Sequence, residues 1–170
     1  HSPQGRNPLL AKINLIRVAV KDLNKHRNSS IPFSQITQDP LEVVEDPSIK
    51  IIVEVMGGIE PARTLILRAI ELGKSVVTAN KALIARHGDE IAEAANKSGV
   101  YVLIEAAVGG GIPIIEPLKQ SLGGNRIKKV TGIINGTTNY ILTRMKKDGS
   151  AYKSVLKDAQ ELGYAESDPT

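Results

Sequence analysis

The chain has 170 residues, enough for one domain with a hydrophobic core or for parts of two, and its apolar content of 41% is ordinary for a globular protein. It contains no cysteine, which excludes disulfides, thiolate zinc sites and a cysteine nucleophile and fits a reducing cytoplasm. The net charge of +4 is spread along a chain whose aromatic residues are four tyrosines and one phenylalanine, so we expect no nucleic-acid partner, and no apolar run reaches the ~20 residues of a membrane span.

The first half of the chain alternates predicted strands with predicted helices. Residues 13–20 are rich in β-branched and aliphatic side chains and predict a strand. The pair Asp39-Pro40 is typical of a helix start, so we expect a short helix after it. Residues 49–55 form a mostly apolar run of the kind found in parallel sheets that are covered on both faces, and Gly57-Gly58 ends it.

A second group of elements follows the glycine pair. Pro61 predicts the start of a helix that ends at Gly73. Its apolar face is expected to consist of residues at helical spacing, namely Ala62, Leu65, Ile66, Ala69 and Ile70. The later elements are predicted as a strand over 75–78, a helix that begins at Lys81, a helical segment over 89–97 with Gly99 as its stop, and a strand over 100–105.

This alternation predicts an α/β fold with a Rossmann-type, doubly wound parallel sheet. Ligands of such sheets bind beyond the carboxyl ends of the strands. We therefore expect Gly57-Gly58, residues 78–81 and residues 105–111 to lie on one binding rim, because each follows a strand. No G-x-G-x-x-G follows the first strand, so a nucleotide-binding fold here is incomplete and lacks its first strand and phosphate loop.

The pattern changes after residue 105, and the domain boundary is expected near residues 105–112. The predicted elements of the second half are a glycine loop over 109–111, a helix over 113–121, a strand over 127–134, a helix capped by Thr137 or Thr138 that ends at Gly149, and a helix over 152–162. No internal repeat interrupts this order.

Two lysines are candidate ligand contacts. Lys81 stands at a helix N-terminus, where a cation is mildly unfavourable, so it either points into water or faces oxygen-rich groups on the rim. Lys21 follows the first predicted strand, where it can pair with the extra phosphate of NADP. A solvated pair with the adjacent Asp22 explains Lys21 equally well.

Two polar clusters lie in the second half. The carboxylate of Glu105, with the backbone carbonyls of Val108, Gly110 and Ile112, can cage a hard cation, although glycine loops without a metal are far commoner. The segment Asn135-Gly136-Thr137 is explained by a turn and a helix cap alone.

Five segments in order carry a family resemblance. They read VEVMGG, SVVTANKALIA, EAAVGGGIPII, GIINGTTNYIL and QELGYAESDPT, and they resemble homoserine dehydrogenase over nearly the whole chain from about residue 8. The resemblance implies an NAD(P)-dependent oxidoreductase that interconverts L-homoserine and L-aspartate 4-semialdehyde on the cytoplasmic route to threonine and methionine. It also implies a Rossmann-type cofactor domain over 1–105 and the start of an α+β catalytic domain over 106–170. In the family, the sheet of this catalytic domain also builds a homodimer.

The resemblance further implies residue roles. Lys81 falls on the family lysine near the nicotinamide and the reacting oxygen, and Glu166 falls on the glutamate that binds the substrate amino group. Met56, Gly57, Gly58 and Asn80 are expected beside the NADP or NAD cofactor, and Asn135, Gly136 and Thr137 beside the substrate. Glu105, Val108, Gly110 and Ile112 fall on the family's site for a monovalent cation, often sodium.

The chain departs from the family pattern at both ends. The family's phosphate loop is absent from the front, and the segment with a catalytic aspartate and lysine is absent after Thr170. We therefore expect an internal portion of the enzyme that is weakly active or inactive alone. The alternatives are a non-catalytic nucleotide-binding or oligomerisation fragment and a nucleic-acid binder; aspartate-semialdehyde dehydrogenase is excluded because it needs a cysteine nucleophile.

Overall fold

The computed structural model describes residues 13–25, 31–133 and 135–165. The chain forms two compact units, His1–Leu103 and Ile104–Thr170, each with its own hydrophobic cluster. Among the helices that the described residues form, none combines the length and the apolar character needed to cross a membrane.

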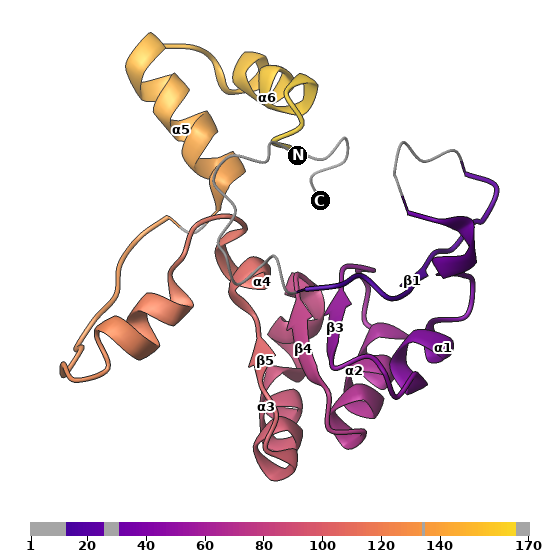
Figure 1. Ribbon diagram of the computed structural model, residues 1–170. Coiled ribbons are helices and arrows are strands. Elements are labelled where there is room, and N and C mark those ends of the chain that lie inside the picture. Colours follow the sequence, from indigo (N-terminus) through magenta and orange to yellow (C-terminus); the bar gives the residue numbers. More distant parts are fainter. Residues whose placement is uncertain (1–12, 26–30, 134, 166–170) are drawn as a thin grey trace. The chain divides into compact units, whose positions relative to one another are not determined.

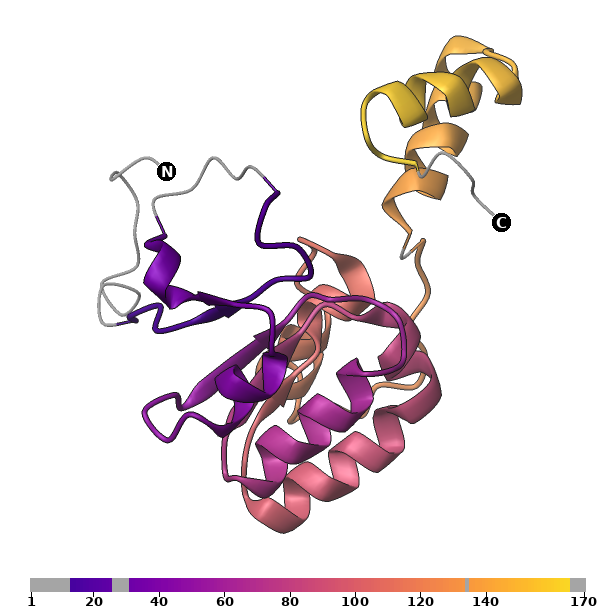
Figure 2. The same cartoon turned by 90° about the vertical axis from the view of Figure 1, so that its right-hand side faces the viewer.

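The first unit is built around a parallel sheet with strand order β3-β4-β5. Its strands are β3 (Ile51–Glu54), β4 (Ser75–Thr78) and β5 (Val102–Leu103), connected by α2 (Ala62–Glu71) and α3 (Lys81–Ser98). Figures 1 and 2 show α2 and α3 side by side against the same face of this sheet. The predicted α/β fold with parallel strands and crossover helices is confirmed.

Helix α2 forms the centre of the first core. All five residues of its predicted apolar face, Ala62, Leu65, Ile66, Ala69 and Ile70, are buried. They pack in one cluster with Ile52 and Val76 of the sheet and Leu83 and Ile91 of α3. The helix ends as predicted at Gly73, whose positive φ of 71° lies in the left-handed region that glycine adopts without strain.

The described residues cover one face of the sheet only, contrary to the prediction from the apolar run 49–55. Along β3, Ile52 and Glu54 are buried, whereas the alternate residues Ile51 and Val53 are 50% and 64% exposed. The physical reason is topological: successive right-handed crossovers that advance in one direction place their helices on the same face. The other face of β3 is therefore apolar and exposed.

A two-stranded parallel sheet precedes the main sheet. It pairs β1 (Val18–Ala19) with β2 (Ile36–Thr37), which follows the 3₁₀ helix η2 (Phe33–Gln35). The strand predicted over 13–20 is thus confirmed only at Val18–Ala19, since residues 13–17 have no regular structure, and β2 and η2 were not predicted. Helix α1 (Pro40–Glu45) begins as predicted, with the N–H of Leu41 donating to Asp39 Oδ1 (2.8 Å).

Helix α3 is one kinked helix from Lys81 to Ser98. Asn80 caps it, because its Oδ1 accepts the N–H of Leu83 (3.1 Å). The backbone of His87 departs from helical geometry (φ −129°, ψ 15°), which separates the predicted start at Lys81 from the predicted segment over 89–97. The stop at Gly99 (φ 65°) is confirmed.

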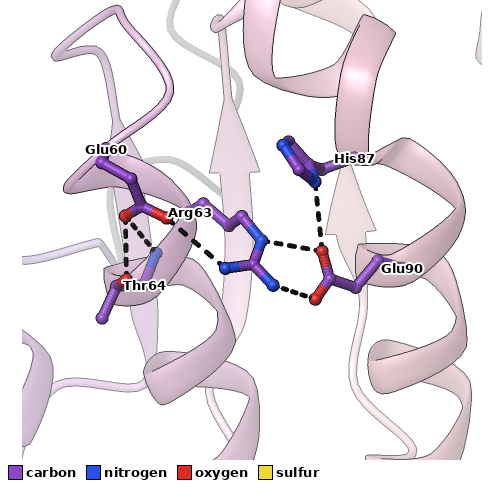
Figure 3. A network of polar contacts seen from close by, with 5 residues as sticks. All are labelled: Glu60, Arg63, Thr64, His87 and Glu90. Carbon is purple, nitrogen blue, oxygen red and sulfur yellow. Dashed lines mark hydrogen bonds and ion pairs between the residues drawn. The ribbon is translucent and has the colours of Figure 1, made fainter.

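An ion-pair network holds α2 and α3 together near the kink (Figure 3). The Arg63 guanidinium donates through Nε to Glu90 Oε2 (2.8 Å) and through Nη2 to Glu90 Oε1, a bidentate arrangement. His87 Nδ1 lies 3.3 Å from Glu90 Oε2, and Arg63 Nη1 lies 3.4 Å from Glu60 Oε1. The hydrogen bonds from Arg63 are the main cause that lowers the pKa of Glu90 below its ordinary value.

We expect Glu90→Gln to lower the free energy of unfolding at neutral pH, and we expect this deficit to shrink as pH falls below the unfolded pKa of Glu90. The folded-state pKa of Glu90 is depressed, so its stabilisation is present above the unfolded pKa of 4.5 and is lost as pH falls through the folded value. Urea unfolding of both proteins at pH 7 and pH 3.5 measures this. A deficit that is equally large at both pH values would contradict the ion-pair explanation.

The described part of the second unit, residues 104–133 and 135–165, contains four helical elements. These are α4 (Glu105–Gly109), the π-helical turn η3 (Pro117–Ser121), α5 (Gly136–Asp148) and α6 (Tyr152–Glu161). Ile141 of α5 packs against Val155 and Ala159 of α6, and all three are buried. Helices α5 and α6 were predicted with nearly these bounds, and the stop at Gly149 is confirmed by its φ of 65°.

Four predictions for the second unit were wrong in detail. Glu105 begins helix α4 instead of ending a strand, and the helix predicted over 113–121 is π-helical over its last five residues. Residues 127–133 form no strand and are exposed, because no described strand lies beside them to accept their backbone hydrogen bonds; residue 134 lies outside the described residues. Asn135 caps α5 in place of Thr137 or Thr138.

Candidate functional site

The turns after β3 and β4 lie at one edge of the main sheet. Glu54 and Thr78 end these strands and are neighbours in the parallel register, and the N–H of Ala79 donates to the carbonyl oxygen of Glu54 (3.2 Å). The carboxyl edge of a parallel sheet is where ligands of this architecture bind. The structure therefore brings together Met56–Gly58 and Asn80–Lys81, the residues predicted to contact a cofactor; the contact itself stays a prediction.

The backbone of the turn after β3 requires glycine. Gly57 and Gly58 have φ values of 76° and 74°, which residues with a Cβ atom rarely adopt. A Cβ on Gly57 would meet no atom within 4 Å, so the requirement is conformational and not steric. At Gly57 and Gly58 the turn thus exposes backbone beside the strand end, next to the exposed side chain of Met56.

Lys81 is the first residue of α3 and its side chain is exposed. Its ammonium makes no salt bridge with the residues that the structure describes. Its backbone N–H donates to the carbonyl oxygen of Ala79 (3.1 Å). The macrodipole of α3 adds positive potential at this position. An exposed cation beside a helix N-terminus is arranged to attract an anionic or strongly polar group.

Lys21 lies apart from this edge in the chain, after β1 of the two-stranded sheet, and is exposed. Its carbonyl oxygen accepts the amide of Gln38 (3.3 Å), and Asp22 Oδ1 accepts the N–H of Asn24 (2.8 Å). These bonds order the turn but do not choose between a cofactor-binding and a solvated Lys21.

In the second unit, the Glu105 carboxylate is engaged by backbone amides. Oε1 accepts the N–H groups of Ile114 and Ile115 (2.9 Å for the latter), and Oε2 accepts that of Glu116 (2.8 Å). These bonds, that from Glu116 foremost, lower the pKa of Glu105 and keep it ionised at neutral pH. A carboxylate has about four acceptor positions, so roughly one remains for another partner.

Among the described residues, no group of three or more histidine and carboxylate side chains could hold a metal ion. The predicted cation site uses one carboxylate, Glu105, and the backbone oxygens of Val108, Gly110 and Ile112, and this set stays a prediction. Gly110 contributes a φ of 62° that turns the chain after α4.

The predicted substrate residues lie at the start of α5. Asn135 Oδ1 accepts the N–H of Thr138 (2.9 Å), and the Thr137 hydroxyl donates to the carbonyl oxygen of Tyr164. The structure thus brings Asn135, Gly136 and Thr137 next to the loop that leads toward Glu166. Glu166 itself lies outside the described residues.

Sequence reasoning missed one functional candidate, Glu54. It is 4% exposed and lies on the covered face of the sheet, in contact with Thr78 and the turn after β3. A lone carboxylate within the apolar run 49–55 was a usable signal, because an ionised group is rarely buried without a specific set of donors.

Comparisons with known proteins agree with this architecture. Residues 3–105 match the model of the homoserine dehydrogenase NAD-binding domain, and residues 113–170 match that of the homoserine dehydrogenase domain. A curated homoserine dehydrogenase from Synechocystis is 61% identical over 168 residues, which are 99% of this chain and 39% of that protein. One from Bacillus subtilis is 44% identical over 93% of this chain and 36% of its own length.

Solved structures give the same result. A homoserine dehydrogenase from Thiobacillus denitrificans superimposes with a TM-score of 0.81 at 53% identity, over 91% of this chain and 36% of that one. A hyperthermophilic archaeal homoserine dehydrogenase in complex with NADPH gives a TM-score of 0.66 at 35% identity, over 77% of this chain and 40% of that one. The chain therefore spans well under half the length of the relatives it matches, and it belongs to the homoserine dehydrogenase family.

Proposed function

We propose that this chain is part of an NAD(P)-dependent oxidoreductase that interconverts L-homoserine and L-aspartate 4-semialdehyde in the cytoplasmic biosynthesis of threonine and methionine. The observation that carries the proposal is the carboxyl edge of the β3-β4-β5 sheet, where the Met56–Gly58 turn and Lys81 lie together. The family match to an NAD-binding domain over residues 3–105 supports the same assignment.

The edge fits a nicotinamide cofactor, NADP or NAD. The turn at Gly57 and Gly58 offers backbone without side chains, which permits close approach of a ligand, and Lys21 is proposed to contact the cofactor beyond β1. When bound, the cofactor accepts or supplies the hydride. The exposed Lys81 ammonium is proposed to stabilise the oxygen of the reacting carbon as its hydroxyl proton leaves.

The second unit is proposed to supply the substrate and cation contacts. Asn135, Gly136 and Thr137 start helix α5 beside the loop after α6, and Glu166 is proposed to bind the substrate amino group. Glu105, fixed by three backbone N–H groups, is proposed to share a sodium or similar monovalent cation with the carbonyl oxygens of Val108, Gly110 and Ile112. Residues 106–170 are proposed to begin a catalytic domain that forms a homodimer, and residues 1–105 to form the cofactor domain.

A chimaeric enzyme tests the proposed function. In it, residues 1–170 replace the matched segment of the Synechocystis homoserine dehydrogenase, which is 61% identical. We expect homoserine-dependent reduction of NADP or NAD, followed by the absorbance of the reduced nicotinamide, with a kcat within about tenfold of the parent enzyme.

The controls separate activity from folding. L-Serine in place of L-homoserine and the 170-residue chain alone provide the two baselines. A chimaera that unfolds cooperatively on heating but does not oxidise homoserine would contradict the proposal.

A further inference from the structure

Glu54 is a buried carboxylate at the end of β3, on the face of the sheet that α2 and α3 cover. Burial of an ionised group is strongly unfavourable unless hydrogen-bond donors surround it. The sequence could place valine or isoleucine here, as at the neighbouring strand positions. The contacts of the carboxylate therefore indicate what it does.

All partners of this carboxylate are donors from two different turns. On one side, the N–H groups of Met56 and Gly57 donate to Oε1 (2.7 and 3.3 Å). On the other side, the Thr78 hydroxyl donates to Oε2 (2.6 Å), and the Asn80 side-chain amide makes a long contact with Oε1 (3.5 Å). The Thr78 hydroxyl is the donor in its bond to Oε2, and the same hydroxyl oxygen accepts the backbone N–H of Asn80 (3.0 Å).

Asn80 makes a second connection between the same two turns. Its side-chain amide donates to the carbonyl oxygen of Gly58 (2.7 Å), while its Oδ1 caps α3 through the N–H of Leu83 (3.1 Å). The position at which α3 begins is thus tied to the turn after β3. Lys81 is the next residue after Asn80, so the bonds that hold Asn80 also fix the position of the Lys81 backbone.

We propose that Glu54 is a positioning residue, which holds the Met56–Gly58 turn and the Thr78–Lys81 turn at a fixed spacing for the nicotinamide cofactor. This proposal rests on the proposed function, since it assumes that the cofactor lies against these two turns. The carboxylate acts through the backbone of its neighbours and does not itself touch the cofactor. A displacement of about 1 Å at such a contact can cost roughly 100-fold in rate, so the spacing has a functional consequence.

Glutamine at position 54 separates this role from simple packing. Glutamine has nearly the same size but only one acceptor oxygen, so it cannot accept both the Met56 N–H and the short bond from the Thr78 hydroxyl; only the 3.5 Å contact with the Asn80 amide remains to the second turn. With its oxygen toward Met56 and Gly57, its NH₂ group faces the Thr78 oxygen and the bond from the Thr78 hydroxyl is lost. Glu54→Gln therefore removes the shortest side-chain link between the two turns without leaving a cavity, while the Asn80–Gly58 bond stays in place.

The first measurement is NADPH affinity of the chimaeric enzyme, by fluorescence titration. We expect Glu54→Gln and Thr78→Val each to weaken binding roughly tenfold or more, as for a lost hydrogen bond to a charged group. The double variant is expected to be little weaker than either single one, because both break the same link. Thr78→Ser, which keeps the hydroxyl, is expected to restore wild-type affinity.

Glu60→Gln is the matched control. Glu60 is an exposed glutamate of the same loop, bonded to Thr64 and Arg63 and not to either turn. Its loss is expected to leave NADPH affinity unchanged. A Glu54→Gln variant with a lowered melting temperature but wild-type affinity would show a merely structural role and overturn the proposal.

The second measurement needs no activity. In the full 170-residue chain, Glu54→Ala is expected to raise the amide exchange rate of Asn80 roughly tenfold or more, although Asn80 lies on the other turn. Unchanged exchange at Asn80 would show that the turns are not coupled and would overturn the proposal. If the chimaera without further substitutions binds NADPH but does not oxidise homoserine, the proposed function is wrong and the proposal for Glu54 stands. If it binds no NADPH, both proposals are wrong.

Discussion

Lys81→Met is expected to lower kcat for homoserine oxidation by about 100- to 1000-fold, the usual effect of removing one group that stabilises a developing oxyanion. Methionine keeps the length and apolar stem of the lysine and removes only the charge. The measurement is the steady-state rate of NADP reduction by the chimaeric enzyme at saturating homoserine. Because the proposed contact with the oxygen of the reacting carbon is strongest in the transition state, kcat and kcat/KM for homoserine should fall together when the cofactor is saturating.

The melting temperature of Lys81→Met should stay unchanged or rise slightly, although its kcat falls. A cation at the N-terminus of α3 is mildly unfavourable, by about 0.3–1 kcal/mol, so its removal is neutral or slightly stabilising. A structural lysine would show the reverse, a lowered melting temperature with little change in kcat. The combination of lost activity and retained stability therefore identifies a functional cation.

Lys97→Met is the matched control for Lys81. Lys97 lies in the last turn of the same helix, is exposed and forms an ion pair with Glu93 (2.7 Å). Exposed pairs of this kind contribute little, so neither kcat nor the melting temperature is expected to change much. Equal losses of activity in both lysine variants would contradict the assignment to Lys81.

The elements that could be predicted from sequence are those with local causes. Helix α2 follows from five apolar residues at helical spacing and a glycine stop, and β4 from a short apolar run after that stop. Asp39 and Pro40 likewise specify the start of α1 within three residues. In each case the signal and the structure it causes are adjacent in the chain.

The errors concern strands, whose existence depends on a partner elsewhere. Residues 13–20 and 127–134 have similar strand-forming composition, yet of the parts that the structure describes, 13–20 and 127–133, only Val18–Ala19 forms a strand, paired with β2. The same limitation applies to the burial of β3. Whether Val53 or Glu54 faces the helices is decided by the hand of the crossovers and not by the strand itself.

In the candidate site, too, the features with local causes could be predicted and those that depend on distant residues could not. The glycine turn at Gly57-Gly58 and the helix start at Lys81 are local features and could be predicted. The link between them through Glu54 and Thr78 could not, because these residues are 24 positions apart and meet only through the register of two parallel strands. For the second unit, residue chemistry offered a cation site at Glu105 and a polar cluster at Asn135 beside simpler explanations, and the family resemblance favoured the functional ones.

Ile66→Ala is expected to lower the free energy of unfolding by about 2–5 kcal/mol, the largest stability effect predicted for the chain. The Ile66 side chain is fully buried, and α2 holds it between the sheet and α3. Truncation removes apolar surface that is excluded from water and leaves a cavity that the tightly packed neighbours fill only in part. Urea unfolding of the 170-residue chain, followed by circular dichroism, measures the loss.

Ile51→Ala provides the comparison that tests the cause, since the same atoms are removed from a side chain that is 50% exposed on the uncovered face of β3. We expect a loss below about 1 kcal/mol there, because little burial is given up and no cavity forms. If the two variants lost stability equally, the sheet face opposite α2 and α3 would have to be covered in solution, and the one-sided core that positions Glu54 and the rim would be wrong.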